Sequence, residues 1–206
     1  MDFVSDSVIN AGSDGVIARV RAHVIAELGD EKPTPFSVTF LGLESLDVLT
    51  FFPRRDEFAR FVTLGCSRYP MSDPGEMIAD ATRGPRAELI LVTRVFDAID
   101  KSFLRNIAKL AATPSVEGVV LRHDLLLDLG EPLWEGAPFT AVLLGSSEIP
   151  DLVLQEPADP VEFLEVVPIT GTEAAWVRLR GADALREAWQ EAGIDVRDPN
   201  RSAVNL

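Results

Sequence analysis

The chain has 206 residues, and its 33 Asp and Glu outnumber its 19 Lys and Arg, which gives a net charge of −14. Binding to the phosphate backbone of nucleic acid needs a basic face, so this balance argues against a nucleic-acid partner. One cysteine cannot form an intrachain disulfide, and the sequence shows neither a signal peptide nor an apolar run of roughly 18 residues that could span a membrane. We therefore expect a cytoplasmic protein with no membrane partner.

The first predicted element is a helix that ends near Leu28. Ser13 or Asp14 can cap its start, and Gly29 is placed to end it. Residues 31–35 then form a proline-containing loop. One face of the helix is apolar, because apolar residues recur at helical spacing: Val16, Ile17, Val20, Val24 and Leu28.

Three strands are predicted next, in the order of a meander. Apolar and polar residues alternate over residues 36–40, and an apolar run marks residues 48–52, so we expect these two strands to pair. A third strand spans residues 58–66. Residues 69–85 are rich in proline and glycine and are predicted to form a loop that could touch a partner, with a helical turn only at residues 76–81.

The middle of the chain alternates strand and helix. Residues 88–95 are dense in Leu, Ile and Val and predict a strand. Asp100 can cap a helix that ends at Ala112, because Pro114 follows. One helix face is apolar: Phe103, Leu104, Ile107, Leu110 and Ala111.

Two further strands are predicted before a mostly polar connection. Residues 118–129 are strand-like, with His123 and Asp124 as an interruption, and residues 139–144 form the next strand. The connection then covers residues 145–160.

The stretch from Val161 to Glu173 is the segment around which we expect the chain to be organised. Its first part is almost entirely apolar, as in a strand covered on both faces near the centre of a sheet. Pro168 has no N–H for a ladder, so pairing on that side should end near it. Thr170 and Glu173 have the spacing of a capping box, which predicts a helix directly after the strand.

The C-terminal part should form one broken helix or two short ones, divided at Gly181 and ended by Gly193. The tail over residues 194–206 lacks a core pattern and is expected to lie along the surface or fray. Strands outnumber helices without alternating one for one. The sequence therefore predicts a single α+β domain over residues 1–206, with a mixed, largely antiparallel sheet flanked by helices.

Catalytic and metal-binding chemistry is poorly represented. Cys66 and His123 form a possible nucleophile and base, but a thiol in a strand is usually buried and inert. One cysteine and two histidines lie far apart, without a short ligand pair for zinc. No glycine-rich phosphate loop or serine nucleophile elbow is present. We expect no catalytic residue, no metal and no cofactor.

Three short motifs, in order, resemble those of the suppressor of fused family. Residues 60–71 (RFVTLGCSRYPM) are similar to its Gly-Leu-Ser strand and turn, with Cys66 in the Leu position. Residues 86–93 (RAELILVT) resemble its Glu-Leu strand, and residues 161–173 (VEFLEVVPITGTE) its strand-to-helix passage. His123 falls where that family has a Gly-His or Asp-His pair. The resemblance is strongest over residues 35–193 and implies a bacterial single-domain member.

The resemblance implies a binding site for a protein. In animal members a target peptide adds as a strand near the histidine, and an acidic residue just before the histidine pairs with that peptide. Arg122 stands at the acidic position here and Leu110 at a matching aromatic position, so a different ligand is expected. Arg122, His123 and Leu110, together with Arg68 and Tyr69 at the start of the 69–85 loop, are the candidate partner contacts.

The predicted function follows from bacterial members of that family, which look like immunity proteins. We expect a non-enzymatic module that binds and neutralises a toxin, and the acidic charge would suit a basic one. Two alternatives from other classes are a hydrolase or transferase that uses Cys66 and His123, and a structural assembly subunit.

Overall fold

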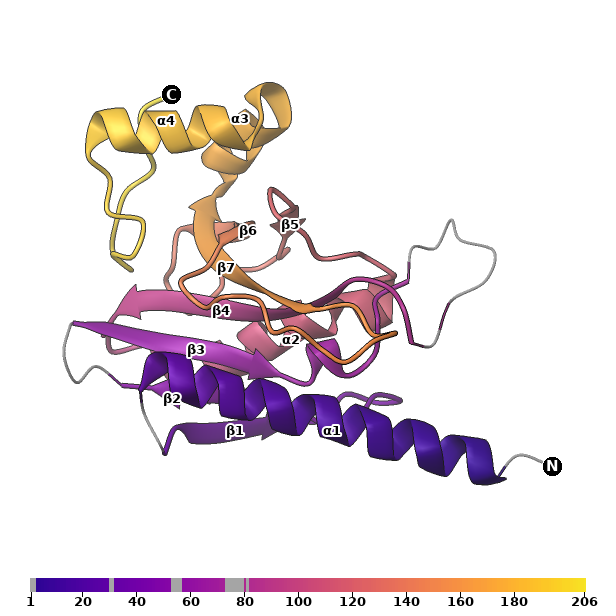
Figure 1. Ribbon diagram of the computed structural model, residues 1–206. Coiled ribbons are helices and arrows are strands. Elements are labelled where there is room, and N and C mark those ends of the chain that lie inside the picture. Colours follow the sequence, from indigo (N-terminus) through magenta and orange to yellow (C-terminus); the bar gives the residue numbers. More distant parts are fainter. Residues whose placement is uncertain (1–2, 30–31, 53–56, 73–79, 81) are drawn as a thin grey trace.

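The computed structural model describes residues 3–29, 32–52, 57–72, 80 and 82–206, with the backbone alone for residues 3–13 (Figure 1). Helices and strands follow in this order: α1 (Phe3–Leu28), β1 (Thr34–Val38), β2 (Leu46–Phe51), β3 (Phe58–Leu64), the 3-10 turn η1 (Cys66–Arg68), β4 (Arg86–Arg94), α2 (Lys101–Glu117), β5 (Leu126–Asp128), β6 (Phe139–Ser146), β7 (Val161–Thr170), α3 (Gly171–Arg180) and α4 (Ala182–Ala192).

The strands form one seven-stranded sheet with the order β1-β2-β3-β4-β7-β6-β5. All neighbouring strands are antiparallel except β4 and β7, which are parallel. The predicted α+β class, with a mixed and largely antiparallel sheet, is confirmed. A parallel pair needs a long crossover, and here α2, β5 and β6 lie in the chain between β4 and β7.

Helices cover both faces of the sheet (Figure 1). On one face α1 packs on β2, β3 and β4, with Val20 and Val24 fully buried. On the other face α2 packs over the centre of the sheet, with Phe103 and Ile107 fully buried. The helices α3 and α4 pack on the end of the sheet formed by β6 and β7, through Leu185 and other apolar residues. None of the described helices is both long enough and apolar enough to cross a membrane.

Strand β7 is central, as the sequence predicts, because it pairs with β4 on one side and β6 on the other. Strand β7 is paired with β4 only as far as its residue Glu165. It stays paired with β6 as far as Thr170, which lies beyond Pro168. The predicted capping box is also confirmed: the hydroxyl of Thr170 accepts from the N–H of Glu173, and the Glu173 carboxylate accepts from the N–H of Thr170. The strand therefore runs directly into α3.

The C-terminal tail fills the gap where β7 separates from β4. The carbonyl of Arg197 accepts from the N–H of Arg94 at 2.9 Å, and Arg201 donates to the carbonyl of Pro168 at 2.9 Å. Arg201 and Val204 are buried. The tail lies along the outside of the domain without regular secondary structure, and it is anchored there because its arginine side chains find partners that are distant in sequence. The expectation that it lacks core residues is wrong, because Val204 is buried in the cluster under α4.

Two predicted helix boundaries are also wrong. Helix α1 continues through Ser13 and Asp14 to Phe3, and Asp14 bonds Arg68 at 2.6 Å instead of capping a helix. Helix α2 continues through Pro114 and ends at Gly118, which has a φ of 68°. A proline so near the end of a helix removes one hydrogen bond from a long helix that is held by its buried face, so the helix survives it.

Two predicted strands are shorter than expected. The strand predicted over residues 58–66 ends at Leu64, because Gly65 has a φ of 130° and starts the η1 turn. The strand predicted over residues 118–129 is reduced to β5, because Asp124 has a φ of 64° and lies in a tight turn. The helical turn predicted at residues 76–81 lies outside the described residues, apart from residue 80.

Candidate functional site

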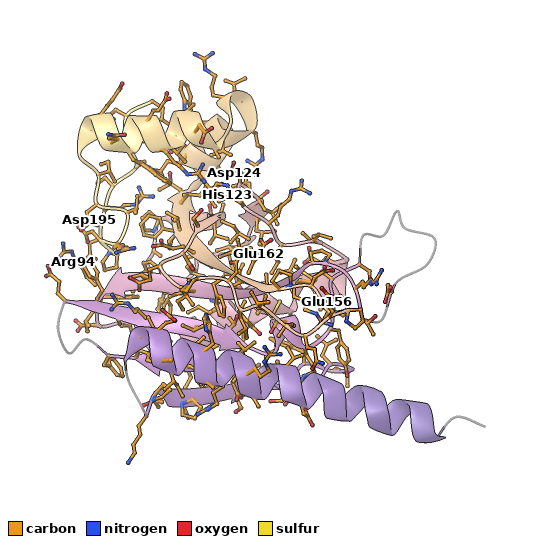
Figure 2. The ribbon with its side chains drawn as sticks, viewed as in Figure 1. Arg94, His123, Asp124, Glu156, Glu162 and Asp195 are labelled. Atoms are coloured by element: carbon orange, nitrogen blue, oxygen red, sulfur yellow. The ribbon has the colours of Figure 1, made fainter. Side chains whose placement is uncertain are left out.

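The turn before β5 places Arg122, His123 and Asp124 at the surface (Figure 2). The N–H of Leu125 donates to the carbonyl of Arg122 at 3.2 Å, which closes the turn. His123 is 48% exposed, and its Nδ1 lies 3.0 Å from the Asp124 carboxylate. The histidine is therefore oriented by the residue that follows it.

Asp124 also ties the turn to α4. Its carboxylate accepts a hydrogen bond from Arg186 at 2.5 Å. Burial opposes ionisation of Asp124, but the hydrogen bond and charge of Arg186, with a smaller effect of His123, lower its pKa below the ordinary value of 3.8. Asp124 therefore stays ionised at neutral pH and lies between Arg186 and the His123 ring.

The strand β5 has a free edge. It is the last strand of the sheet, and among the described strands it pairs only with β6. The backbone groups of Leu125 and Leu129 form hydrogen bonds with β6. In an antiparallel pair, every second residue of a strand directs its N–H and C=O to the partner strand, and the residues between direct theirs to the other side. The backbone N–H and C=O of Leu126 and Asp128 therefore face outward, and no residue in the described part of the chain bonds them.

A hollow of about 160 Å³ lies between α2 and the segment that follows β5. Its apolar lining comes from Leu110, Leu129, Pro132 and Leu133. Its polar lining comes from three carboxylates, one lysine and two neutral residues: Glu117, Asp128, Glu131, Lys109, Asn106 and Thr113. Within the chain Glu131 pairs with Lys109, and Asp128 pairs with Arg178. Leu110 is only 4% exposed, so it belongs to the wall of this hollow and not to an open contact surface.

Arg68 and Tyr69 both bind other residues of the chain, although Tyr69 remains 40% exposed. The guanidinium of Arg68 pairs with Asp14 of α1 at 2.6 Å and with Glu44 at 2.8 Å. The hydroxyl of Tyr69 donates to the same Glu44 at 2.8 Å. These side chains therefore hold the loop before β2 and the helix α1 against η1.

The loop that begins at Arg68 and Tyr69 and the turn at Arg122 and His123 are joined by a hydrogen bond between neighbouring residues. The N–H of Leu121 donates to the sulfur of Met71 at 3.3 Å, and both residues are buried. The fold thus brings the Arg68–Tyr69 end of the loop towards the Arg122–His123 turn. Their polar side chains turn to different partners, so they do not form one cluster.

The surroundings of Cys66 disfavour its thiolate form. Burial, together with the charge of the nearby Glu88 carboxylate, raises the pKa of Cys66 well above its ordinary value of 9.0. No hydrogen bond joins Cys66 and His123 within the described residues, where His123 pairs with Asp124. Neither residue lines the hollow beside α2. Over the described ranges, no group of three or more His, Cys, Asp or Glu could hold a metal ion.

Sequence reasoning missed three parts of this site. Asp124 could have been found, because an Asp directly after a His can reach the imidazole through a turn. The hollow and the carboxylates that line it gave no local signal, since Glu117 and Glu131 come from different elements. The free edge of β5 depends on the order of strands in the sheet.

The chain matches the sequence model of one protein family, described as suppressor of fused protein, over residues 42–202. None of the curated proteins compared with the chain matches it. Its structure is similar to a proposed suppressor of fused homologue from Neisseria gonorrhoeae FA 1090, with a TM-score of 0.67 and 20% identity, over 92% of this chain and 96% of that chain.

Two further solved structures have the same fold. One is the complex of Sufu with Fu, with a TM-score of 0.62 and 12% identity over 94% of this chain and 91% of that chain. The other is Drosophila Suppressor of Fused, with a TM-score of 0.62 and 13% identity over 90% of this chain. The match spans 50% of the Drosophila chain.

Proposed function

Because this chain belongs to the suppressor of fused family, we propose that it is a non-enzymatic module that binds a protein by pairing a partner segment with the free edge of β5. The observation that carries this proposal is the unpaired edge beside a hollow with an apolar wall. Main-chain hydrogen bonds to an edge strand supply affinity, and alternate side chains of the added segment reach the neighbouring hollows.

The other edge of the sheet is less suited to strand addition. The edge strand β1 contains Pro35, which has no N–H, and proline on an edge strand is a common protection against pairing. The strand β5 contains no proline. This difference favours β5 as the edge that accepts a partner.

The lining of the hollow indicates the chemistry of the partner. An apolar side chain fits between Leu110 and Leu133, and Glu117 would attract Lys or Arg beside it, whereas Glu131 already pairs with Lys109 at 2.7 Å. The net charge of −14 would also speed the approach of a basic protein. We infer that the partner is a basic toxin, which this chain blocks as an immunity protein.

The known relatives support a protein partner without supplying its identity. Sufu was crystallised in complex with Fu. Arg122 occupies the position at which animal members have an acidic residue, and in this chain Asp124 holds His123 instead. The surface beside His123 therefore carries an added positive charge and would select a different peptide.

Leu126→Pro tests the site, because it removes an outward N–H that a partner strand needs and leaves the hydrogen bonds to β6 in place. The matched control is Leu126→Val, which keeps that N–H. Affinity capture from the source cell, followed by mass spectrometry, should recover a stoichiometric basic protein with the wild type and Leu126→Val but not with Leu126→Pro. Far-ultraviolet circular dichroism checks that all three chains are folded.

The immunity role needs a second measurement. The captured protein, expressed alone, should arrest growth, and co-expression of the wild-type chain should restore it while Leu126→Pro does not. Recovery of no stoichiometric partner would count against protein binding. A partner that binds Leu126→Pro equally well would place the interface elsewhere, and a partner that is harmless to the cell would rule out the toxin.

A further inference from the structure

A groove runs between α3 and α4, on their outer side. It has a volume of about 410 Å³ and is lined by Trp176 and Arg180 of α3 and by Ala184, Glu187, Ala188 and Glu191 of α4. The two helices are joined at Gly181, and in Figure 1 they lie together at one end of the molecule. Their inner sides pack on β6 and β7 through Leu185, Ala174 and Val177.

The α3 wall of the groove combines an aromatic ring with a cationic side chain, Trp176 and Arg180. Trp176 is half-buried, and the guanidinium of Arg180 lies 5.4 Å from the centre of its ring. The indole N–H of Trp176 is buried and has no hydrogen-bond partner among the described residues. Leu179, on the same helix, is 76% exposed. A buried donor without a partner is uncommon in a folded protein, so the indole N–H of Trp176 is open to an acceptor from a partner.

The α4 wall consists of two glutamates and two alanines. Glu187 and Glu191 are exposed and four residues apart in the helix, so their carboxylates lie on one side of α4. Neither carboxylate forms a hydrogen bond or ion pair with any residue that the structure describes. Ala184 and Ala188 share this wall, and their small side chains let another backbone approach closely.

We propose that the α3–α4 groove is a second docking surface, which takes a basic amphipathic helix of a partner protein. The apolar stripe of such a helix would contact Trp176 and Leu179, and Lys or Arg at its margin would pair with Glu187 and Glu191. A second copy of this chain is a poor occupant, because each copy carries a net charge of −14.

This proposal is independent of strand addition at β5. The helices α3 and α4 pack on the face of β6 that carries Ala141 and Leu143, whereas the hollow beside α2 lies on the face that carries Val142 and Leu144. The groove and the β5 edge would therefore bind different segments. Asp128 of β5 pairs with Arg178 of α3, so the groove is tested only with substitutions at other residues.

The test uses a synthetic peptide of Leu and Lys arranged as an amphipathic helix, titrated into the full chain. The readout is Kd by isothermal titration calorimetry, with tryptophan fluorescence in parallel, since Trp176 is the least buried of the described tryptophans. Glu187→Lys with Glu191→Lys should weaken binding by about tenfold or more. Trp176→Ala should also weaken it and remove the fluorescence change.

A matched control separates the groove from general attraction to an acidic protein. Glu156→Lys with Glu162→Lys makes the same change of charge at two exposed residues that lie away from α3 and α4 (Figure 2). This control should change Kd by less than about threefold. Equal weakening by both pairs of substitutions, or binding that neither pair changes, would overturn the proposal.

Discussion

Glu173 is the residue on which the C-terminal part of the fold depends most. Its side chain is 0% exposed and accepts from Arg201 at 2.7 and 3.0 Å, from Trp189 at 3.0 Å and from the N–H of Val204 at 3.3 Å. Glu173 also completes the capping box at the start of α3. One carboxylate thus joins β7, α3, α4 and the tail.

Glu173→Gln should lower the free energy of unfolding by about 3–5 kcal/mol, because it leaves the buried Arg201 without an opposite charge. Urea denaturation measures the loss. Glu187→Gln, at an exposed glutamate, is the control and should have little effect. A second substitution, Arg201→Met, should recover much of the loss, since the buried charge is then gone. A loss below about 1 kcal/mol for Glu173→Gln would contradict this account.

Glu165 and Glu173 should respond to pH in opposite directions. Burial raises the pKa of Glu165 above its ordinary value of 4.5, and Arg197 offsets this only in part. The folded state then binds the proton more readily, so stability falls as pH rises from 4.5 through the raised pKa. At Glu173 burial also acts to raise the pKa, but hydrogen bonds from Arg201 and Thr170 lower it overall. The stability that the ionised Glu173 contributes is present above pH 4.5 and is lost as pH falls through the lowered pKa.

Urea unfolding from about pH 3 to pH 8 can separate the two residues. Glu165→Gln should gain stability relative to the wild type as pH rises above 4.5. Glu173→Gln should lose stability relative to the wild type as pH rises towards 4.5, with a constant difference above it. If the stability differences of the two variants from the wild type changed with pH in the same direction, the opposite pKa shifts of Glu165 and Glu173 would be contradicted.

Among the elements, α2 contains a position that can be improved. Pro114 lies inside the helix and has no N–H to donate to the carbonyl of Leu110. Pro114→Ala restores that donor and should raise the free energy of unfolding by about 1–3 kcal/mol in urea denaturation. Val116→Ala, at an exposed residue of the same turn, is the matched control. An unchanged stability of Pro114→Ala would show that the proline costs the helix nothing, and a lower stability would show that the proline stabilises the fold.

At the scale of the whole molecule, the tail closes the sheet that β4 and β7 leave open. Arg197 reaches Glu165 at 3.2 Å, Arg201 reaches Glu173, and Val204 is buried beside α4. Deletion of residues 194–206 should cost at least about 5 kcal/mol, because it removes a buried ion pair and buried apolar surface. This is a large share of the stability of a typical domain.

Thermal unfolding followed by circular dichroism measures this effect. Deletion of residues 205–206, which are exposed, is the control and should leave the midpoint unchanged. If the chain that ends at residue 193 unfolds at the wild-type temperature, the tail does not hold the sheet together.

The sequence by itself determined the elements whose signals are local. The apolar density of β7, the capping box of Thr170 and Glu173 and the break at Gly181 all depend on neighbours within a few residues, and the structure agrees with each. The order of three short motifs identified the family. Reasoning from local signals failed at Pro114 and Asp14, where tertiary packing overrides local preference.

Only the tertiary structure decided which distant residues meet. Arg201 pairs with Glu173, Arg68 with Asp14 and Glu44, and Asp124 with Arg186, and none of these pairs follows from spacing along the chain. The free edge of β5 follows from the order of the strands, and the hollow beside it from the packing of α2. Local sequence sets the conformation of the backbone, but a binding surface is made where separate elements come together.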